Sequence, residues 1–547
     1  MTRQSIGLTS NRTRVAPWVK RVAGLGALGV SVAAMTALYA CSGDDNSITA
    51  PPVNDSGPNV TPDGSPDGGP ITNNDGGPNT TPDGGDGGPP PACSSLPGQI
   101  VYIESGDTQQ PLLKALGRHL RDEANVTIVY QLTGSCTLTP NLYSGVAIPA
   151  NTNMLYIPST AENGAWTTAN PESTCTTSAA TPPDLGISAL FTSSCASAGA
   201  QPAGIGTWNG PTQAYTFIVP STEYAGGQTS IQAEEAYYAL GDGANNPVTF
   251  GGNPEWNVPA QFFLRPQSKS TLVATAKNIH LTAVQAIDGE ADGGTADGRQ
   301  LLATSSLVLS GVAASTSAQA LGILGDEVYD ANRTAGVKVL AFRAFNQGLA
   351  FYPDSTETAF DKQNIRDGHY SLWSPTVYIA PQTGNVPTNP TVKFIVDTVL
   401  GNPGASLDGG TSDAGAPVDG LKLVVGAGLT PTCAMQVQRS GDGKDLSLYT
   451  PAAPCTCKFL SEIPGATSGS LPASCTTCGS NADCTAAGTL GCFNGYCESP
   501  VTPPAATDGG ACGNTCIINA TTTAISVDKA GVVLPPLDDG GLDPVSP

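Results

Sequence analysis

Between residues 96 and 400, segments with the apolar pattern of a β-strand alternate with segments in which apolar residues recur at helical spacing. The first strand-like segment is the apolar run Gln99–Ile103. The first helix-like segment is Pro111–Ala124, in which four leucines recur at helical spacing. Proline suits the first position of a helix, because the backbone N–H there has no partner within the helix. We therefore predict a strand, a loop and a helix in this order, followed by a second strand at Val126–Leu132.

The same alternation continues along the chain. We predict strands at Met154–Ile157, Leu185–Leu190, Tyr215–Val219, Gln261–Leu264, Leu321–Leu324 and Val337–Phe342, and helices at Gln228–Leu240, Ser305–Ala314, Thr356–Asp367 and Pro390–Leu400. Strands that alternate with helices indicate an α/β protein with mostly parallel sheets. Because about 300 residues exceed one comfortable hydrophobic core, we expect two lobes with a cleft between them.

Changes in composition divide the rest of the chain. We expect a signal peptide at residues 1–40, a disordered Pro/Gly/Asp-rich tether at 41–95, the two-lobed domain at 96–402, a linker at 403–420, a Cys-rich module at 421–517 and a disordered tail at 518–547. Within the two-lobed domain, we assign residues 96–210 and 305–402 to lobe 1 and residues 211–304 to lobe 2. The tether repeats Asp-Gly pairs, but it lacks the regular nonapeptide that a calcium-binding repeat needs.

The N-terminus has the features of an export leader. Five basic residues precede the uncharged, mostly apolar segment Val22–Ala40, and Cys41 follows it directly. The segment Leu38–Cys41 resembles the processing site of bacterial lipoproteins, in which Cys41 becomes the lipidated first residue. A transmembrane helix is the alternative, since the length is nearly sufficient. We expect a bacterial cell-envelope protein that is held by its lipid at the periplasmic face or the outer membrane.

The chain is strongly acidic, with a formal net charge of −22. Removal of residues 1–40 takes away five basic and no acidic residues, which lowers the formal charge to −27. Binding to nucleic acid and docking on anionic lipid both need a positive surface, so this charge argues against them. An anionic ligand would need a local positive site.

The stretch Gln261–Leu281 combines an apolar strand, a basic turn and a helix. Arg265 and the proline after it end the strand, and Ser268 or Ser270 can cap the helix. A helix N-terminus beside a guanidinium, the ammonium group of Lys269 and several hydroxyl groups suits an anion, because the N–H groups and the helix dipole act together. An ordinary capped helix with a surface arginine is the alternative.

Other predicted strands also end in turns that are rich in small donors. Ligands of open α/β sheets bind at the carboxyl ends of the strands, where these turns lie. We therefore expect the turns to converge on one small oxyanion. The predicted ligand-binding residues are Ser105, Gly106, Asp107, Thr108, Gly134, Ser135, Ser188, Arg265, Lys269, Ser270 and Thr271.

Six segments follow one another between Pro97 and Leu400. They are VYIESGDTQQPLLKALGRHL, VTIVYQLTGSC, DLGISALF, RPQSKST, SSLVLSGVAASTSAQALGILG and STETAFDKQNIRDGHYSLWSPTVYIA. In this order they resemble motifs of the phosphate-type periplasmic substrate-binding proteins of ABC transporters. RPQSKST, for example, has the spacing of the family's Arg-x-x-x-Ser-Gly-Thr. The resemblance implies a type II periplasmic-binding fold, phosphate bound in an interlobe cleft, and delivery of the ligand to an ABC permease.

Two positions depart from the pattern of that family. The aspartate of the family's Gly-x-Ser-Asp element falls on Ala189, and its Ser-Gly pair becomes Lys269–Ser270. In phosphate binders that aspartate accepts the proton of hydrogen phosphate, so the resemblance implies a changed selectivity. Loss of an acceptor and gain of a cation favour sulfate or a larger acidic ligand such as an organic phosphate, whereas Asp107 can supply the missing acceptor.

Cysteines are concentrated near the C-terminus. Fourteen follow Cys41, and ten of these lie between Cys433 and Cys516. An even number of cysteines in an exported protein predicts a disulfide framework. The Cys475-x-x-Cys478 spacing is zinc-like in part, but this tail has no histidine. We expect disulfides, no metal ion, and a module that caps a domain or contacts another protein.

The sequence gives little support to catalysis. The three histidines, His119, His280 and His369, lie in no catalytic or metal-binding motif, and there is neither a Walker loop nor a Gly-x-Ser-x-Gly element. We predict a binding protein without a cofactor rather than an enzyme. The alternative is a surface adhesion or structural lipoprotein on a binding-protein fold that has lost phosphate binding, as Ala189 and the Cys-rich tail suggest.

Overall fold

The computed structural model describes residues 89–164, 172–225, 227, 229–250, 253–288, 298–401, 419–467, 469–484, 491–499 and 532–533. The predicted signal peptide, Cys41 and most of the predicted tether lie outside the described residues, as do Cys512, Cys516 and nearly all of the predicted tail. Within the described part of the chain, no helix combines the length and the apolar character needed to cross a membrane.

Lobe 1 is built on a mixed sheet whose centre is parallel. Its strands are ordered β4 (Ser173–Thr176), β3 (Asn153–Tyr156), β2 (Val126–Leu132), β1 (Gln99–Ser105), β5 (Leu185–Ser188), β15 (Trp373–Thr383) and β6 (Ile205–Pro220). β1 runs parallel to both β2 and β5, so the carboxyl ends of these three strands meet at one edge. The leucines of α1 (Gln110–Glu123) pack in this lobe's core together with apolar residues of α11 (Pro390–Val399) and α12 (Gly420–Gly426).

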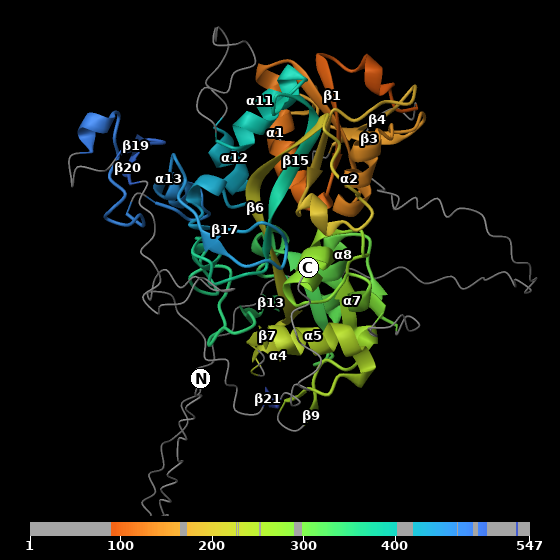
Figure 1. The fold of residues 1–547 in the computed structure, drawn as a ribbon, viewed down its shortest axis with the longest axis vertical. Helices are drawn as coiled ribbons and strands as arrows, with labels where there is room; N and C mark the ends of the chain where they lie inside the picture. The colour runs from red at the N-terminus through yellow and green to blue at the C-terminus, as the bar shows by residue number, and fades with distance from the viewer. Residues whose placement is uncertain are drawn as a thin grey trace, which may run out of the picture. The chain divides into compact units, whose positions relative to one another are not determined.

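Lobe 2 continues the same sheet. From β6 the order runs through β12 (Leu321–Gly325), β10 (Phe262–Leu264) and β11 (Gln300–Leu301), and β13 (Val337–Val339) also pairs with β6. The helices α5 (Ala233–Asp242), α6 (Ser270–Asn278), α8 (Ser305–Ala314) and α9 (Asp326–Ala331) contribute to two apolar clusters here. The long strands β6 and β15 lie side by side and connect the lobes (Figure 1), because each contributes to the cores of both.

The remaining elements are short. The other helices are α2 (Ser135–Ser144), α3 (Thr160–Asn163), α4 (Ser221–Ala225), α7 (Gln285–Asp288), α10 (Gln363–Arg366) and α13 (Thr456–Glu462), with 3-10 turns η1 (Cys93–Ser95), η2 (Asp107–Gln109), η3 (Thr192–Ser194), η4 (Gly243–Asn245), η5 (Pro259–Gln261), η6 (Thr432–Ala434) and η7 (Asn481–Asp483). The other strands are β7 (Ser230–Gln232), β8 (Thr249–Phe250), β9 (Asn253–Pro254), β14 (Ala341–Arg343), β16 (Val386–Pro387), β17 (Val437–Gln438), β18 (Ser447–Leu448), β19 (Gly491–Phe493), β20 (Tyr496–Glu498) and β21 (Val532–Val533).

The predicted α/β class, with two lobes and a disulfide-rich C-terminal region, is confirmed, whereas two predicted helices are shorter than expected. The segment Gln228–Leu240 contains strand β7 and becomes helical only at Ala233, because Gln232 is extended and forms a capping box with Glu235. The segment Thr356–Asp367 is helical only at α10, which begins after a residue with left-handed backbone geometry.

The division between the lobes also differs from the prediction. Residues 305–372, which the prediction assigns to lobe 1, pack in lobe 2. The physical reason is strand pairing, since β12 lies between β10 and β6 and brings α8 with it. The chain returns to lobe 1 only along β15.

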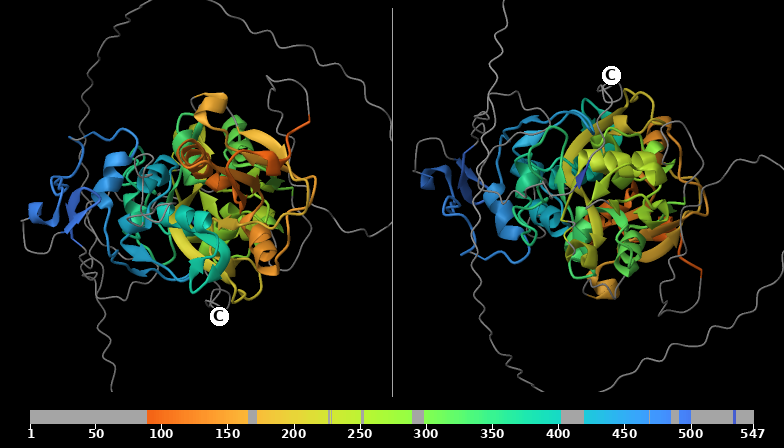
Figure 2. Two further views of the ribbon diagram at one scale, coloured as in Figure 1. Left: turned by 90° about the horizontal axis from the view of Figure 1, so that it is seen from above. Right: turned by 90° about the horizontal axis from the view of Figure 1, so that it is seen from below.

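The predicted Cys-rich module at 421–517 is not a separate unit over its whole length. Val424 and Leu429 lie in the core of lobe 1, whereas Met435, Val437 and Leu446 lie in the core of lobe 2. The part that remains beyond these cores contains α13, β19 and β20, and α13 packs beside α12 (Figure 2). The stretch 421–449 is thus an integral part of both lobes.

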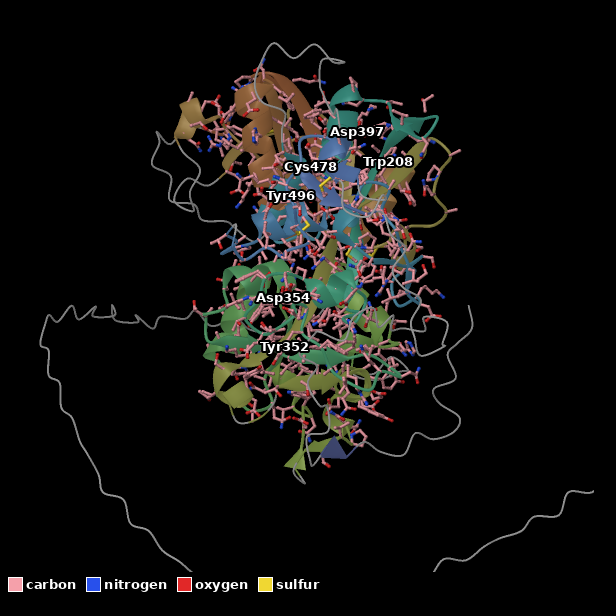
Figure 3. The ribbon with its side chains drawn as sticks, turned by 90° about the vertical axis from the view of Figure 1, so that its left-hand side faces the viewer. Trp208, Tyr352, Asp354, Asp397, Cys478 and Tyr496 are labelled. Atoms are coloured by element: carbon pink, nitrogen blue, oxygen red, sulfur yellow. A yellow bond between two sulfur atoms is a disulfide. The ribbon has the colours of Figure 1, made fainter. Side chains whose placement is uncertain are left out.

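Disulfides join twelve cysteines of the described residues. They are Cys93–Cys175, Cys136–Cys195, Cys433–Cys455, Cys457–Cys475, Cys478–Cys492 and Cys484–Cys497. The disulfides predicted for the C-terminal region are confirmed over the described cysteines, as the bond at Cys478 illustrates (Figure 3). Cys475 and Cys478, the pair with zinc-like spacing, both belong to disulfides and therefore offer no thiolate to a metal ion.

Candidate oxyanion site between the lobes

The turn after β1 and the first residue of α2 lie together at the edge of the lobe 1 sheet. The N–H of Gly106 donates to the carbonyl oxygen of Ile187 at 3.1 Å, which holds the turn against β5. A Cβ atom added to Gly106 would lie 3.7 Å from Oγ of Ser135 and 3.9 Å from Oγ1 of Thr108. The predicted residues of these two turns are therefore neighbours, because the strands that precede them, β1 and β2, are adjacent and parallel.

Arg265 follows β10 in lobe 2 and reaches the first turn of lobe 1. Its side chain is only 1% exposed. Nη2 donates to Oδ2 of Asp107 at 2.6 Å, and Nη1 donates to Oγ of Ser305 at 3.3 Å. Nε has no hydrogen-bond partner among the described residues. A buried guanidinium group thus spans the two lobes, and its Nε–H remains available among the described residues.

Two of the predicted hydroxyl groups, those of Ser135 and Thr108, are buried near each other but differ in their hydrogen-bond partners. Oγ of Ser135 accepts a hydrogen bond from the N–H of Ala189 at 3.0 Å, which leaves its own proton free to be donated elsewhere. Oγ1 of Thr108 is buried without a hydrogen-bond partner among the described residues. A buried hydroxyl group without a partner is costly, so Thr108 favours a ligand that accepts its proton.

Two other predicted hydroxyl groups are used within their own turns. Oγ of Ser105 donates to the carbonyl oxygen of Gly106 at 3.0 Å. Oγ of Ser188 donates to the carbonyl oxygen of Leu190 at 2.8 Å. Both serines lie at the expected strand ends, but their side chains stabilise the turns and do not face a common ligand in this conformation.

The start of α6 contacts lobe 1 directly. Nζ of Lys269 donates to the carbonyl oxygen of Thr133 at 2.6 Å, and the N–H of Cys136 donates to the carbonyl oxygen of Ser268 at 3.2 Å. A Cβ atom added to Gly134 would lie 2.5 Å from that same oxygen of Ser268, so glycine permits this close approach. The ammonium group of Lys269 therefore connects the lobes here.

Tyr215 in β6 lies behind the site and was not predicted as a functional residue. Its hydroxyl group donates to the carbonyl oxygen of Ala189 and is hydrogen-bonded to Ser270, whereas the neighbouring Thr271 is simply buried. Burial raises the pKa of Tyr215 well above its usual value, and the hydrogen bond with Ser270 opposes that rise. A tyrosine in a buried strand needs a partner for its hydroxyl group, and that requirement was the available signal in the sequence.

A buried chain of polar side chains leads from the lobe 1 turn into lobe 2. Nε2 of Gln109 donates to Oε1 of Gln213 at 3.0 Å, and Nε2 of Gln213 donates to Oε2 of Glu327. Burial raises the pKa of Glu327 well above its usual value, and the charges of Asp326 and Asp107 raise it further. No sequence motif marks these residues, because they meet only through the packing of β6 against α9.

The segment between β17 and β18 bridges the two lobes. The carboxylate of Asp442 accepts hydrogen bonds from the N–H of Phe191 at 3.1 Å and from Oγ of Ser194 at 2.6 Å, both in lobe 1. In the same segment, Nη1 of Arg439 donates to Oδ1 of Asn278 at the end of α6 in lobe 2, at 2.8 Å. Burial raises the pKa of Asp442, while these hydrogen bonds oppose the rise. The C-terminal segment therefore contributes to the closed arrangement of the lobes.

A cluster of three carboxylates in lobe 2 has the spacing of a cation site. Oxygen atoms of Asp326, Asp330 and Asp354 lie within 4.8 Å of one another. Nζ of Lys362 lies 2.6, 2.5 and 3.1 Å from these three carboxylates, respectively. The ammonium group takes the position that a metal ion would need, so we assign no metal to this cluster.

The arrangement as a whole can bind a small oxyanion that carries a proton. Arg265 supplies charged N–H donors, Thr108 and Ser135 supply hydroxyl donors, and Asp107 supplies an acceptor. The first and the last of these residues come from different lobes, so such a ligand would be enclosed when the lobes meet. Nothing in this set resembles a nucleophile with an activating base.

Comparison with known proteins gives structural likeness without sequence likeness. No protein-family model matches the chain, and no curated protein matches its sequence. One similar solved structure is a Clostridium perfringens protein described as a phosphate ABC transporter substrate-binding protein, with bound phosphate, at 11% identity and a TM-score of 0.37, covering 61% of this chain and 100% of that chain. An ABC-type phosphate transport receptor from Vibrio cholerae has 12% identity and a TM-score of 0.34, with 61% and 100% covered.

Other similar structures have a different role. The CcmR regulatory domain from Synechocystis in complex with 2-PG has 10% identity and a TM-score of 0.30, covering 55% of this chain and 96% of that domain. Values this low identify no ligand for this chain. We therefore infer its function from the side chains of the site.

Proposed function

We propose that this protein is an extracytoplasmic solute-binding protein that captures a small oxyanion, with phosphate as the preferred ligand, between its two lobes. The observation that supports this most directly is the ion pair of the buried Arg265 with Asp107, which joins the lobes. A guanidinium group donates to anionic oxygens, and a carboxylate accepts the proton that hydrogen phosphate carries at neutral pH. Nε of Arg265 and the hydroxyl group of Thr108, each without a partner among the described residues, are further donors for this ligand.

The position of Asp107 favours phosphate over sulfate. Ala189 removes the acceptor that the resemblance assigns to phosphate binders, and this change alone would favour sulfate. Asp107 restores an acceptor from the neighbouring turn, with Oδ2 at 2.6 Å from Nη2 of Arg265. Sulfate carries no proton at neutral pH, so its oxygens would face this carboxylate without a hydrogen bond. A fully deprotonated ligand should therefore bind less tightly than hydrogen phosphate.

Entry of the ligand requires the lobes to separate. The ties at Lys269 and at Gly134 are direct contacts between the lobes. We infer that the anion inserts between Arg265 and Asp107 and exchanges their mutual contact for contacts to its own oxygens. The net charge of the pair is zero, so hydrogen bonds and helix N-termini must hold the divalent anion in addition to the guanidinium charge.

Titration calorimetry with phosphate, sulfate and an organic phosphate tests this proposal. The full mature chain and the variants Arg265→Ala and Arg343→Ala are compared, where Arg343 is a partly buried arginine paired with Glu234 away from the site. We expect phosphate to bind the wild type and Arg343→Ala with similar affinity. We expect phosphate to bind more weakly to Arg265→Ala, and more weakly to wild-type protein that has first been saturated with sulfate. Failure of every oxyanion to bind at millimolar concentration would refute the proposal.

A structural role at the cell surface is the second candidate. The observation that favours it is the number of direct ties between the lobes, which include Lys269 with Thr133 and Asp442 with Ser194. If the chain is a structural lipoprotein that has lost its ligand, the Arg265–Asp107 pair replaces the ligand and holds the lobes permanently closed. Small-angle scattering with and without phosphate separates the two candidates, since only a receptor should change its lobe arrangement with ligand.

The place of the protein in the cell envelope is a proposal based on the sequence. We propose that Cys41 is the lipid-modified first residue of the mature chain and that an ABC permease receives the ligand. Mass spectrometry of the N-terminal peptide of protein purified from its native membrane tests the anchor. A mature chain that still begins at Met1 would refute it.

A further inference from the structure

The loop between β17 and β18, residues 439–446, is held against the end of α6 in lobe 2. Nη1 of Arg439 donates to Oδ1 of Asn278, the last residue of α6, at 2.8 Å. A Cβ atom added to Gly443, whose φ is +72°, would lie 2.4 Å from the carbonyl oxygen of Lys277, so glycine permits this close approach. The other end of α6 contacts lobe 1. The loop and lobe 1 therefore hold this helix from opposite ends.

The same loop holds a turn of lobe 1 through Asp442. Oδ2 of Asp442 accepts hydrogen bonds from the N–H of Phe191 at 3.1 Å and from Oγ of Ser194 at 2.6 Å. Its Oδ1 accepts a hydrogen bond from Oγ of Ser374 in β15 at 2.6 Å. Asp442 is only 5% exposed, so these three donors take the place of water around its carboxylate. One carboxylate from the C-terminal segment thus holds the 189–194 turn against β15.

The 189–194 turn reaches the oxyanion site through its first residue. The N–H of Ala189 donates to Oγ of Ser135 at 3.0 Å, and the carbonyl oxygen of Ala189 accepts a hydrogen bond from the hydroxyl group of Tyr215. Because Oγ of Ser135 accepts here, its own proton is left for another acceptor. The position of Ala189 therefore determines how Ser135 presents its proton to a ligand.

A disulfide holds the other side of the same turn. Cys195 directly follows the turn and is bonded to Cys136, the residue next to Ser135. This covalent bond limits the distance between the turn and α2. Hydrogen bonds depend strongly on direction, so the three bonds to Asp442 add a restraint on the orientation of the turn. Distance and orientation together are what a fixed hydroxyl donor requires.

We propose that Asp442 is a positioning residue of the oxyanion site, which holds the 189–194 turn so that Ala189 fixes Oγ of Ser135 and directs its proton to the ligand. This inference rests on the proposed oxyanion function and extends it to the C-terminal segment. Asp442 acts through Ser135 and does not itself touch the ligand. Donors that are already in place bind a ligand more tightly, because less ordering accompanies binding.

Three variants of the full mature chain separate positioning from charge. Asp442→Ala removes all three hydrogen bonds. Asp442→Asn removes the charge but keeps the geometry, because its amide oxygen can accept from Phe191 and Ser194 while its NH₂ group donates to Oγ of Ser374. Asp445→Ala changes an exposed aspartate of the same loop and serves as the matched control.

Two measurements are made on each variant, under conditions in which circular dichroism shows it to be folded. Hydrogen exchange without phosphate reports on the turn itself, and we expect the amides of Ala189 and Phe191 to exchange about tenfold faster or more in Asp442→Ala. Calorimetric titration reports on the site, and we expect the affinity of this variant for phosphate to fall about tenfold. Asp442→Asn and Asp445→Ala should stay within about threefold of the wild type in both measurements.

A role in stability alone would lower the urea midpoint of Asp442→Ala and leave the phosphate affinity of its folded form unchanged. Ser194→Ala is a milder variant that removes one hydrogen bond to Asp442. It should weaken phosphate binding about threefold, and it provides the test if Asp442→Ala does not fold.

The proposal is overturned if wild-type protein binds phosphate and the folded Asp442→Ala and Ser194→Ala variants bind it equally well. It is also overturned if Asp442→Asn loses as much affinity as Asp442→Ala, since the charge of Asp442 would then matter instead of its hydrogen bonds. A wild type that binds no oxyanion would refute the oxyanion function itself, and the titration of the wild type therefore distinguishes the two failures.

Discussion

Arg265 and Asp107, which are 158 residues apart in the chain, form an ion pair between the lobes with Nη2 2.6 Å from Oδ2. The arginine comes from the end of β10 in lobe 2 and the aspartate from the turn after β1 in lobe 1. The side chain of Arg265 is 1% exposed, whereas that of Asp107 is 20% exposed. Asp107 is therefore the partner that water can reach.

Replacement of Arg265 by alanine should abolish phosphate binding. Removal of one partner of a buried charged contact costs about 2 to 5 kcal/mol of binding free energy. Arg265→Lys should restore part of the affinity, because it retains the charge but loses the planar pair of N–H donors. Calorimetric titration with phosphate measures both effects. Equal affinity of the alanine variant and the wild type would exclude Arg265 from the site.

Replacement of Asp107 by asparagine should change the preference between phosphate and sulfate more than it changes the ability to bind an anion. The amide cannot accept the proton of hydrogen phosphate with a charged oxygen, but its NH₂ group can donate to sulfate. We expect Asp107→Asn to bind phosphate more weakly than the wild type does. We expect the same variant to bind sulfate more tightly than the wild type does. Competition between the two anions in the same calorimeter gives the ratio. An unchanged ratio would assign proton acceptance to another residue.

The carboxylate cluster of lobe 2 should make stability depend on pH. Burial raises the pKa of Asp326 to about 7, with Lys362 opposing the rise and Asp330 and Asp354 adding to it. Because the folded-state pKa is raised above the usual value of 3.8, the stabilising contribution of this group is full below about pH 4 and is lost as the pH rises to about 7.

The wild type should therefore lose stability relative to Asp326→Asn between pH 4 and pH 7, by at most about 1.4 kcal/mol per pH unit. Urea unfolding of both proteins across this range gives the difference. Parallel curves would show that Asp326 stays ionised in the folded protein. Lys362→Met should be far less stable than the wild type at pH 7, by about 3 to 5 kcal/mol, because it leaves buried carboxylates unpaired.

Asp442 should stabilise the contact between the C-terminal segment and the two lobes. Besides its partners in lobe 1, its Oδ1 accepts a hydrogen bond from Oγ of Ser374 in β15 at 2.6 Å. Hydrogen bonds to a charged group contribute about 1.5 to 3 kcal/mol each, so Asp442→Ala should lower the free energy of unfolding by about 3 kcal/mol or more. The exposed neighbour Asp445 provides the control, and Asp445→Ala should change stability by less than about 0.5 kcal/mol. Similar urea midpoints for the two variants would contradict the bridging role.

The disulfides should leave no free thiol on the described cysteines. Thiol titration of denatured, unreduced protein tests this, and stoichiometric zinc together with reactive thiols would contradict it. The Cys136–Cys195 bond closes a loop of 59 residues next to the oxyanion site. Its replacement by two serines should cost about 4 kcal/mol of stability in the chain-entropy model. Thermal unfolding of the double variant, with and without phosphate, measures that loss.

Features that depend only on residues close together in the sequence could be predicted from the sequence alone. The leucine spacing of α1 and the apolar runs of β1, β2 and β10 predict those elements, because helix and strand periodicity follow from local backbone geometry. The cysteine content likewise predicts disulfides in the C-terminal region, since pairing in an exported protein requires no knowledge of the fold. The basic turn at Arg265 was also visible as a candidate site.

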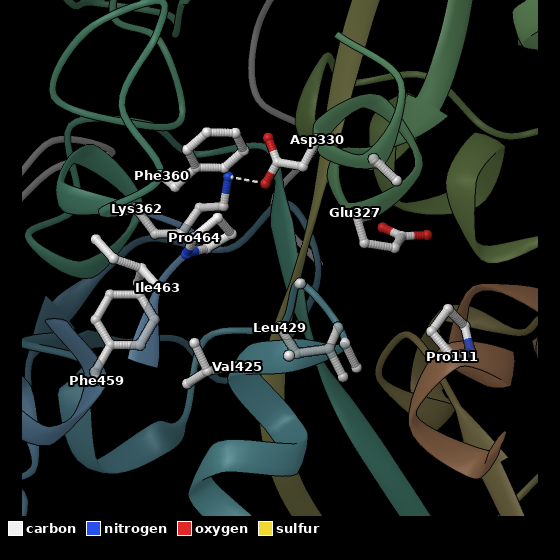
Figure 4. A pocket seen from close by; sticks show the side chains of 14 residues that line it. Pro111, Glu327, Asp330, Phe360, Lys362, Val425, Leu429, Phe459, Ile463 and Pro464 are labelled. Carbon is white, nitrogen blue, oxygen red and sulfur yellow. Dashed lines mark ion pairs between the residues drawn. The ribbon is translucent and has the colours of Figure 1, made fainter. Parts of the chain in front are cut away.

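Features that depend on distant residues were decided only by the tertiary structure. Ser188 and Lys269 occupy the expected turns, yet their side chains bind backbone oxygens, because the local geometry and the approach of the lobes offer those acceptors. Residues 305–372 belong to lobe 2 because β12 pairs with β10 and β6, and periodicity contains no information on which strand becomes a neighbour. Glu327 illustrates the same limit, since the cavity beside it (Figure 4) arises where α9 meets a segment about a hundred residues further along the chain.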